Sequence, residues 1–303
     1  MEVVFLDSYN KGKNDYAVCL GSFDGIHIGH KRLMARTVEI AKEKGLKSGA
    51  VIILPPVEKN KLFPMEENLR RIEKTGIDTV FIIKFTEEFK KLSPKAFADK
   101  YLDEIICAKY VICGFNFRFG HNREGTPEAL RELGKGIFEL TVIDRVFIED
   151  KTVSSSYIKS LLEEGKIERV NALLGECYLI SDTVKKGKQL GRSIEVPTVN
   201  LKLSPELSLI KKGVYSSVSE IDGENFESIS YIGNAPTVGD FGELVLETHI
   251  LDYKGDLYEK KVTVKLVGFI REEKKFSSLN ELKEEIKANI ITAKKQISEC
   301  EYI

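Results

Sequence analysis

The stretch over residues 21–30, GSFDGIHIGH, constrains the fold of this chain more than any other part of it. It follows an apolar run over residues 16–20, typical of a short buried strand, and precedes residues 31–44, where apolar side chains recur at helical spacing. His27 and His30 can both lie on one side of the first helical turn, where free backbone N–H groups favour phosphate. The stretch therefore predicts a polyphosphate site between a strand and a helix; the alternative is that the two histidines only cap the helix.

Length and composition narrow the class of protein. The 303 residues leave room for two domains, and the shares of hydrophobic (42%) and charged (31%) residues are typical of a soluble globular protein. No apolar run approaches the roughly 20 residues that span a bilayer, and the N-terminus lacks the pattern of a secretory signal. A net charge of −1 does not favour nucleic acid, and the five cysteines have no metal-binding spacing. We expect a cytoplasmic monomer or weak homo-oligomer with no membrane or nucleic-acid partner.

Strands and helices alternate through residues 1–172. The patterns predict strands over residues 1–6, 16–20, 48–54, 79–84, 109–113 and 138–143, and helices over 31–44, 66–74, 94–103 and 127–133. Such alternation indicates right-handed βαβ units on a parallel sheet, with ligands at the carboxyl ends of the strands. We therefore expect a Rossmann-like α/β domain over residues 1–172, with residues 21–30 at its ligand-binding edge.

Two further loops lie at equivalent strand ends. The aromatic, glycine-containing loop over residues 114–121 can stack on a flat ring or simply pack on itself, and its candidate residues are Asn116, Phe117 and Phe119. The loop over residues 153–159 places hydroxyls at the start of a helix, where they cap it and can also bind phosphate. Its candidate residues are Ser154, Ser155, Ser156 and Lys159.

The pattern changes after Gly175, which ends a helical segment over residues 167–174. Short β-rich runs separated by turns follow, over residues 177–184, 214–221, 226–232, 244–252 and 257–268. An amphipathic helix over residues 279–298 ends the chain. We expect a second domain over residues 173–303, an antiparallel β-barrel or a sandwich, closed by that helix.

This half has its own candidate site. Residues 185–200 form a glycine- and lysine-rich segment, either a phosphate-wrapping loop or an ordinary basic hairpin. Thr198 and Asn200 are two residues apart on an extended segment, so both oxygens face one side, as a shared Mg²⁺ requires. Glu247 lies in an otherwise apolar strand, where partial burial would raise the proton affinity of a base, unless the side chain faces outward.

The motifs of both halves resemble one family. GSFDGIHIGH is similar to the signature of the HxGH nucleotidyltransferases, in the form found in the bacterial bifunctional riboflavin kinase/FMN adenylyltransferases. The PTVN, GNAPT, ETHILD and FIREEKKF segments resemble the family's kinase elements and follow in the same order. The resemblance covers nearly the whole chain. It implies phosphorylation of riboflavin by ATP to give FMN, then transfer of AMP from ATP to FMN to give FAD and pyrophosphate, both with Mg²⁺.

The resemblance also implies roles for individual residues. For adenylyl transfer it implies that His27 and His30 are catalytic, that Asn116, Phe117 and Phe119 bind flavin, and that ATP is bound by those histidines with Gly21, Phe23, Asp24, Gly25, Ser154, Ser155, Ser156 and Lys159. For the kinase it implies Glu247 as the base, Thr198 and Asn200 as ligands of Mg²⁺ and ATP, ATP contacts from Gly187, Lys188, Gly191 and Arg192, and flavin contacts from Arg271, Glu273 and Phe276.

Some positions depart from the family pattern. Residues 52–57 read IILPPV where the family often has TFxPHP, so the histidine of that flavin-binding loop is missing. Glu195 replaces a glycine in the kinase loop, and Lys159 replaces an arginine, which loses a bidentate fork. Two alternatives therefore stay open: an enzyme with only one working half, and a flavin- or nucleotide-binding regulator without turnover.

Overall fold

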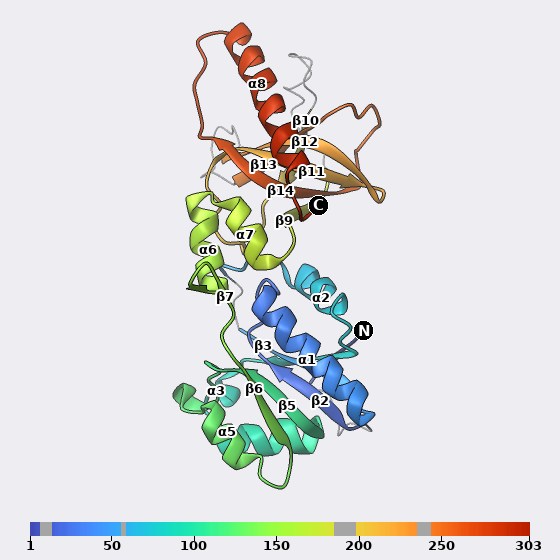
Figure 1. The fold of residues 1–303 in the computed structure, drawn as a ribbon, viewed down its shortest axis with the longest axis vertical. Coiled ribbons are helices and arrows are strands. Elements are labelled where there is room, and N and C mark those ends of the chain that lie inside the picture. The colour runs from blue at the N-terminus through green and yellow to red at the C-terminus, as the bar shows by residue number, and fades with distance from the viewer. Residues whose placement is uncertain (7–13, 56–58, 185–197, 235–243) are drawn as a thin grey trace. The chain divides into compact units, whose positions relative to one another are not determined.

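The computed structural model describes residues 1–6, 14–55, 59–184, 198–234 and 244–303. Its contacts divide the chain into two compact units, Met1–Ser155 and Ser156–Ile303 (Figure 1). This division comes earlier than the predicted domain boundary at residues 172/173, because helix α7 (Ile167–Leu174) packs on strand β14 (Lys261–Arg271) of the second unit. The domain boundary itself stays a prediction.

The first unit is built on a parallel sheet in the order β1-β4-β3-β2-β5-β6, as the alternation of elements predicted. The strands are β1 Glu2–Phe5, β2 Tyr16–Leu20, β3 Lys47–Leu54, β4 Thr79–Lys84, β5 Ala108–Gly114 and β6 Glu139–Ile143. From β2 the chain runs to β3 and β4 on one side and later to β5 and β6 on the other. The order therefore reverses between β2 and β5, and ligands of such sheets bind at that switch point.

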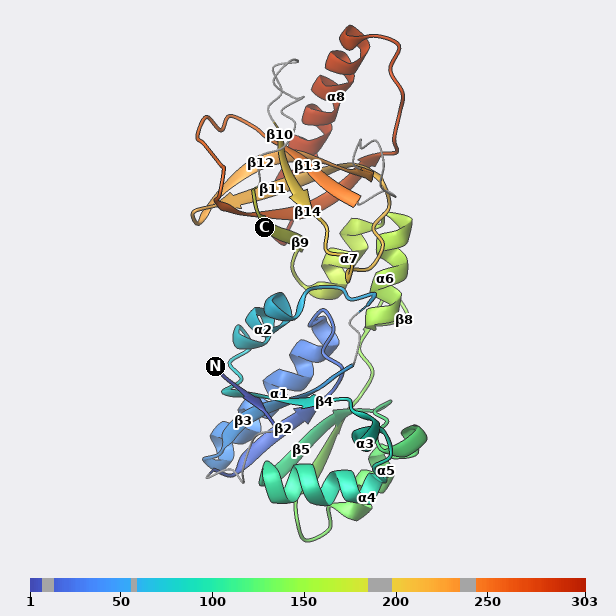
Figure 2. The same cartoon turned by 180° about the vertical axis from the view of Figure 1, so that it is seen from behind.

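Helices cover both faces of this sheet (Figures 1 and 2). They are α1 Ile28–Lys44, α2 Met65–Glu73, α3 Glu87–Lys90, α4 Pro94–Phe97 and α5 Pro127–Leu133. Because side chains alternate along a strand, Ala17 and Cys19 of β2 join the core beneath α1 and α2, whereas Val18 and Leu20 join the core beneath α4 and α5. The fully buried β2 is thus packed from both sides.

Local signals set most helix ends. Ser93 and Thr126 cap α4 and α5 through their hydroxyls, and Gly45 ends α1 in the left-handed conformation with φ 67°. The helix predicted over residues 94–103 begins where expected but differs in kind, since it continues from α4 as a π-helix over Ala98–Ile105. No pattern of apolar residues distinguishes these two helical forms over so short a segment.

The second unit is a curled antiparallel sheet, in the order β10-β13-β12-β11-β14-β9, whose edge strands β9 and β10 contact each other. Its other strands are β9 Tyr178–Thr183, β10 Thr198–Lys202, β11 Gly213–Ile221, β12 Glu224–Asn234 and β13 Leu244–Ile250. Helix α8, Leu279–Ser298, packs on β11, β12 and β14. The predicted antiparallel barrel with a closing helix is thus confirmed.

Hydroxyls line one buried patch of this sheet. The Oγ atom of Ser217 lies 2.8 Å from Oγ of Ser228 and 2.7 Å from Oγ of Ser230. The Oγ atom of Ser230 in turn lies 2.8 Å from Oγ1 of Thr248. All four side chains are buried, and the bonds join strands β11, β12 and β13. Buried hydroxyls are tolerated because each finds a partner in the next strand.

The remaining elements are short. A hairpin of β7 (Phe147–Ile148) and β8 (Lys151–Thr152) precedes α6 (Ser155–Glu164). Among the described residues, no helix has the length and apolar character needed to cross a membrane.

Candidate active sites

The first site lies where β2 ends and α1 begins, at the switch point of the parallel sheet. His27 is the N-cap of α1, and its Nδ1 accepts a hydrogen bond of 3.2 Å from the backbone N–H of His30. The two imidazole rings stack with centroids 3.7 Å apart and planes 14° apart. The capping bond uses Nδ1 of His27, so its ring proton lies on Nε2, the atom left to meet a ligand. The spacing of the histidines predicted this placement on one side of the helix.

Both rings are neutral at physiological pH. Burial lowers the pKa of His27 to about 4 despite its backbone hydrogen bond and nearby Asp24. Burial, and then the neighbouring His27, hold the pKa of His30 well below its usual range. The Nδ1 atom of His30 is buried and makes no hydrogen bond within the described residues. An anionic ligand would reverse these effects, because nearby negative charge favours the protonated ring.

These pKa values predict a pH dependence of stability. The unfolded chain binds a proton at His27 with the ordinary pKa of 6.5, whereas the folded chain does so near 4. The contribution is therefore complete above pH 6.5 and is lost as pH falls toward 4, by roughly 3 kcal/mol at about 1.4 kcal/mol per pH unit. Urea unfolding followed by circular dichroism at pH 7.5 and 5 should show a smaller loss in His27→Asn than in the wild type. Equal losses of unfolding free energy in the two proteins would contradict the lowered pKa of His27 as the cause.

Three segments distant in sequence hold the signature loop, residues 21–30, in place. Asp24 Oδ1 accepts a hydrogen bond of 2.9 Å from the backbone N–H of Leu62, and its carbonyl accepts one of 2.8 Å from Ser155 Oγ. The backbone N–H of Gly25 donates to Asn68 Oδ1 over 3.0 Å. Gly25 has φ +89°, and a Cβ there would lie 2.4 Å from Leu62, so only glycine fits. Asn68 was missed from sequence, because nothing local links α2 to residue 25.

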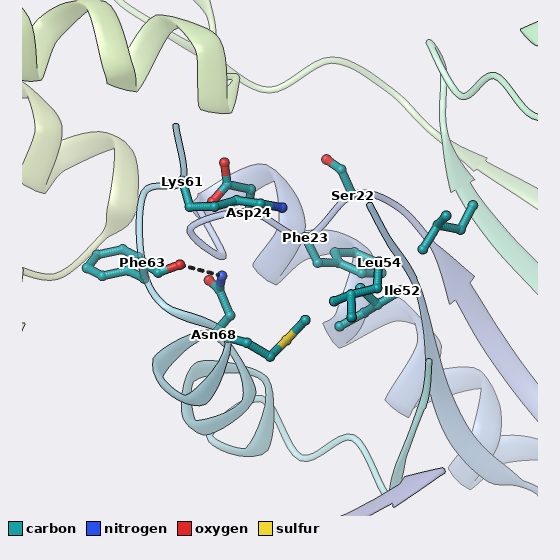
Figure 3. Close-up of a pocket in the computed structure, with 10 residues that line it drawn as sticks. Ser22, Phe23, Asp24, Ile52, Leu54, Lys61, Phe63 and Asn68 are labelled. Carbon is teal, nitrogen blue, oxygen red and sulfur yellow. Dashed lines mark hydrogen bonds between the residues drawn. The ribbon is translucent and has the colours of Figure 1, made fainter. Parts of the chain in front are cut away.

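A pocket opens beside this loop at the ends of β2 and β3 (Figure 3). Apolar side chains of Ile52, Leu54 and Met65 form part of its lining, and Lys61 and Asn68 are polar members on the same rim. Asn68 Nδ2 donates to the carbonyl of Phe63 over 3.3 Å. Its full lining is Ser22, Phe23, Asp24, Ile52, Ile53, Leu54, Lys61, Phe63, Met65 and Asn68. The pocket thus lies where residues 52–57 depart from the family pattern; of these, Pro56 and Val57 lie outside the described residues.

The aromatic loop follows β5, the strand beside β2. Asn116 is exposed, Phe117 is half-buried, and the two rings of Phe117 and Phe119 stack 5.5 Å apart. Phe119 is only 3% exposed and packs on Phe97 at 5.4 Å, as part of the core. The predicted flavin contacts of this loop stay a prediction, and the burial of Phe119 favours Asn116 and Phe117 for that role.

The serine segment begins α6. Ser155 is the residue that reaches the signature loop, through its bond to the Asp24 carbonyl. Ser156 and Lys159 lie on the first turns of α6, whose residues from Ser156 onward belong to the second compact unit. Their predicted contacts with ATP, and that of Ser154, stay predictions.

The second site is formed on one face of the antiparallel sheet. In the register of β10 with β13, Asn200 lies opposite Glu247 and Thr198 opposite His249. Directly opposite residues share a face, with Cβ atoms about 4.5–5.5 Å apart. The structure therefore brings together Thr198, Asn200 and Glu247. Glu247 is half-buried, and burial raises its pKa, as its apolar sequence context predicted.

The predicted flavin residues of the kinase follow β14. Arg271 Nε lies 3.3 Å from Asn289 Oδ1 and 3.1 Å from Glu285 Oε1 on α8. The guanidinium of Arg271 lies 5.5 Å from the centre of the Phe276 ring. Glu273 accepts a hydrogen bond from the hydroxyl of Tyr231. The remaining residues predicted for the kinase site lie outside the described residues. They are the predicted ATP contacts Gly187, Lys188, Gly191 and Arg192, and the substituted Glu195.

Comparisons with known proteins identify both halves. A family model for FAD synthetase matches residues 9–157, and one for riboflavin kinase matches residues 174–297. The bifunctional riboflavin kinase/FMN adenylyltransferase of Listeria monocytogenes is 32% identical over 274 residues, which cover 88% of this chain and 87% of that protein. The chain belongs to this family. The predicted family and its pair of enzyme activities are thereby confirmed.

Other riboflavin kinase/FMN adenylyltransferases align over similar lengths. The relative from Bacillus subtilis is 31% identical over 89% of this chain and 88% of its own. The relative from Escherichia coli strain K12 is 31% identical over 91% of this chain and 90% of its own. A solved structure described as a macrolide-efflux protein from Streptococcus pneumoniae, 25% identical, covers 97% of this chain and 99% of its own with a TM-score of 0.88. The fold of this solved structure thus matches that of both units of the chain.

Proposed function

We propose that this chain converts riboflavin to FMN in its second unit and FMN to FAD in its first. The observation that best supports this proposal is that each unit has its own reactive centre. The first has the stacked His27 and His30 at the switch point of a parallel sheet. The second has Glu247 opposite Asn200 on an antiparallel sheet. The two centres have no residue in common, so we expect that each step can be disabled separately.

For adenylyl transfer, the phosphate of FMN attacks the α-phosphorus of ATP and pyrophosphate leaves. His27 and His30 donate hydrogen bonds to the phosphates and offset the charge that develops on them. The flavin would lie against the pocket beside the signature loop, where Ile52, Leu54 and Met65 offer apolar side chains to a flat ring. Lys61 at the same pocket is a cation suited to the phosphate of FMN.

For phosphorylation, Glu247 accepts the proton of the riboflavin 5′-hydroxyl as that oxygen attacks the γ-phosphorus of ATP, the bond from this phosphorus to the bridging oxygen breaks, and ADP leaves. Its raised pKa makes it a stronger base than an ordinary carboxylate. Phosphoryl transfer otherwise needs positioning and charge neutralisation, so no covalent intermediate with the protein is required.

We propose Mg²⁺ as the metal of both reactions, held in the second unit by Thr198 and Asn200. Their hydroxyl and amide oxygens are hard donors that suit this ion, and they lie on the face of the sheet that carries Glu247. When bound, the ion neutralises phosphate charge. The described residues contain no cluster of three or more histidine, cysteine or acidic ligands, so phosphate and water oxygens would complete the coordination.

The expected cytoplasmic location, the absence of membrane and nucleic-acid partners, and the monomeric or weakly oligomeric state remain proposals. ATP, riboflavin and FMN fit the activities of the family as small-molecule substrates.

Chromatography of the products made from riboflavin, ATP and Mg²⁺ tests the proposal, with a second reaction started from FMN. We expect FMN followed by FAD from riboflavin, and FAD from FMN. FMN alone would mean that the first unit does not turn over, with the altered segment at residues 52–57 as the first cause to examine. FAD only from supplied FMN would mean an inactive kinase. Flavin binding without ATP consumption would favour a regulator instead.

A further inference from the structure

Tyr231 lies beside the proposed base of the kinase reaction. It belongs to β12 and stands directly opposite Glu247 in the antiparallel register of β12 with β13. Opposite residues share a face of the sheet, with Cβ atoms about 4.5–5.5 Å apart. Asn200 approaches Glu247 in the same way from the other neighbouring strand, β10. Tyr231 and Asn200 therefore flank Glu247 from its two sides.

The phenol of Tyr231 leans along β12 over Gly233. A Cβ at Gly233 would lie 2.0 Å from Tyr231 Oη and 2.2 Å from Cζ, so any larger residue would displace the ring. From this position the hydroxyl donates its hydrogen bond to Oε1 of Glu273, in the segment that follows β14. The absence of a side chain at residue 233 thus decides where the hydroxyl of Tyr231 points.

The surroundings of this phenol favour its neutral, hydrogen-bond-donating form still further. Burial, the bond to Glu273 and the charges of Glu273 and Glu247 raise the pKa of Tyr231 to about 12. The ring is therefore neutral at physiological pH, and its hydroxyl proton is given to Glu273. Two carboxylates flank one uncharged ring, which separates them without adding charge.

We propose that Tyr231 is a positioning residue of the kinase site, which fixes Glu273 and forms the wall beside Glu247 against which riboflavin is placed. The inference rests on the proposed function of the second unit. Riboflavin has a flat apolar ring system and a chain of hydroxyls, so a phenol face and a fixed carboxylate suit it. A carboxylate held before binding loses less freedom when it binds, which favours affinity.

Tyr231→Phe removes only the hydroxyl and tests this role. We expect the KM for riboflavin to rise about tenfold, as for loss of a hydrogen bond to a charged group, while kcat stays within about twofold because Glu247 is untouched. The control is Tyr253→Phe, whose ring leans over Gly255 in the same manner, with Oη 2.4 Å from a Cβ placed there. A KM unchanged in Tyr231→Phe would overturn the proposal.

A double-mutant cycle shows whether Tyr231 acts through Glu273. Glu273→Ala alone should raise the KM for riboflavin, and adding Tyr231→Phe should raise it no further. Effects of the two substitutions that multiply would mean independent roles and would overturn the proposed link. Glu273 is exposed, so its variant can be read even if Tyr231→Phe proves unstable.

Riboflavin binding, followed by quenching of flavin fluorescence without ATP, separates this inference from the proposed function. Wild-type protein that binds riboflavin but forms no FMN in the presence of ATP would refute the proposed kinase function. Weaker binding by Tyr231→Phe would still support the placement of Tyr231, and equal binding would overturn it. A wild-type protein that binds no riboflavin would overturn both.

Discussion

Replacing both His27 and His30 with alanine should reduce FAD formation from FMN and ATP by about 10³-fold or more, the range seen when charge-stabilising donors are removed. The rings stack at the N-terminus of α1, and Nε2 of His27 is left for a ligand because Nδ1 caps the helix. FMN formation from riboflavin should stay within about twofold of wild type, because its reactive group, Glu247, belongs to the other unit. Both rates come from one chromatographic assay of the same preparation.

A control separates catalysis from capping. His27→Asn keeps a side-chain oxygen that can accept the bond from the backbone N–H of His30, but it removes the imidazole. We expect this variant to fold as the wild type does at neutral pH and to lose most of its adenylyl transfer. FAD formation that survives the double alanine substitution would refute the assignment of the first site.

Glu247→Gln should lower FMN formation by about 10²–10⁴-fold, the usual contribution of a positioned general base. Glutamine has nearly the same shape but cannot accept the proton of the riboflavin hydroxyl. FAD formation from supplied FMN should not change. Since burial raises the pKa of Glu247 above its ordinary 4.5, the wild-type kinase rate should fall as pH drops through that raised value.

The residual activity of Glu247→Gln should lack this acidic limb. Glu227→Gln is the matched control: Glu227 lies on β12 of the same sheet, with Oε2 3.7 Å from Lys294 Nζ on α8, and should leave both rates unchanged. Equal kinase rates in Glu247→Gln and the wild type would remove Glu247 from the role of base.

Short-range patterns predicted much of the fold and part of each site. The apolar run over Tyr16–Leu20 is a strand with both faces buried, and the three-residue spacing of His27 and His30 does place their rings together. The two-residue spacing of Thr198 and Asn200 does put them on one face of β10. In each case a local period of the backbone decides the geometry.

Contacts between distant segments escaped prediction. Ser155 reaches the carbonyl of Asp24 across 131 residues, and Asn68 reaches Gly25 across 43. The register that sets Tyr231 opposite Glu247 depends on how β12 pairs with β13, which neither strand specifies alone. Phe119 packs on Phe97 of α4, a contact that the sequence of its own loop does not indicate. Such facts follow from tertiary packing, for which a single sequence carries no local signal.

The hydroxyl-lined patch of the second unit bears on how this sequence can change over evolutionary time. Ser217, Ser228, Ser230 and Thr248 each rely on a neighbour in the next strand. Exchanging one of them for an aliphatic residue leaves the hydroxyl of its partner buried without a hydrogen bond, which lowers the stability of the fold. Exchanging both members of a bonded pair avoids that cost. Drift at these positions is therefore coupled, and related sequences should keep the hydroxyls of a bonded pair together or lose them together.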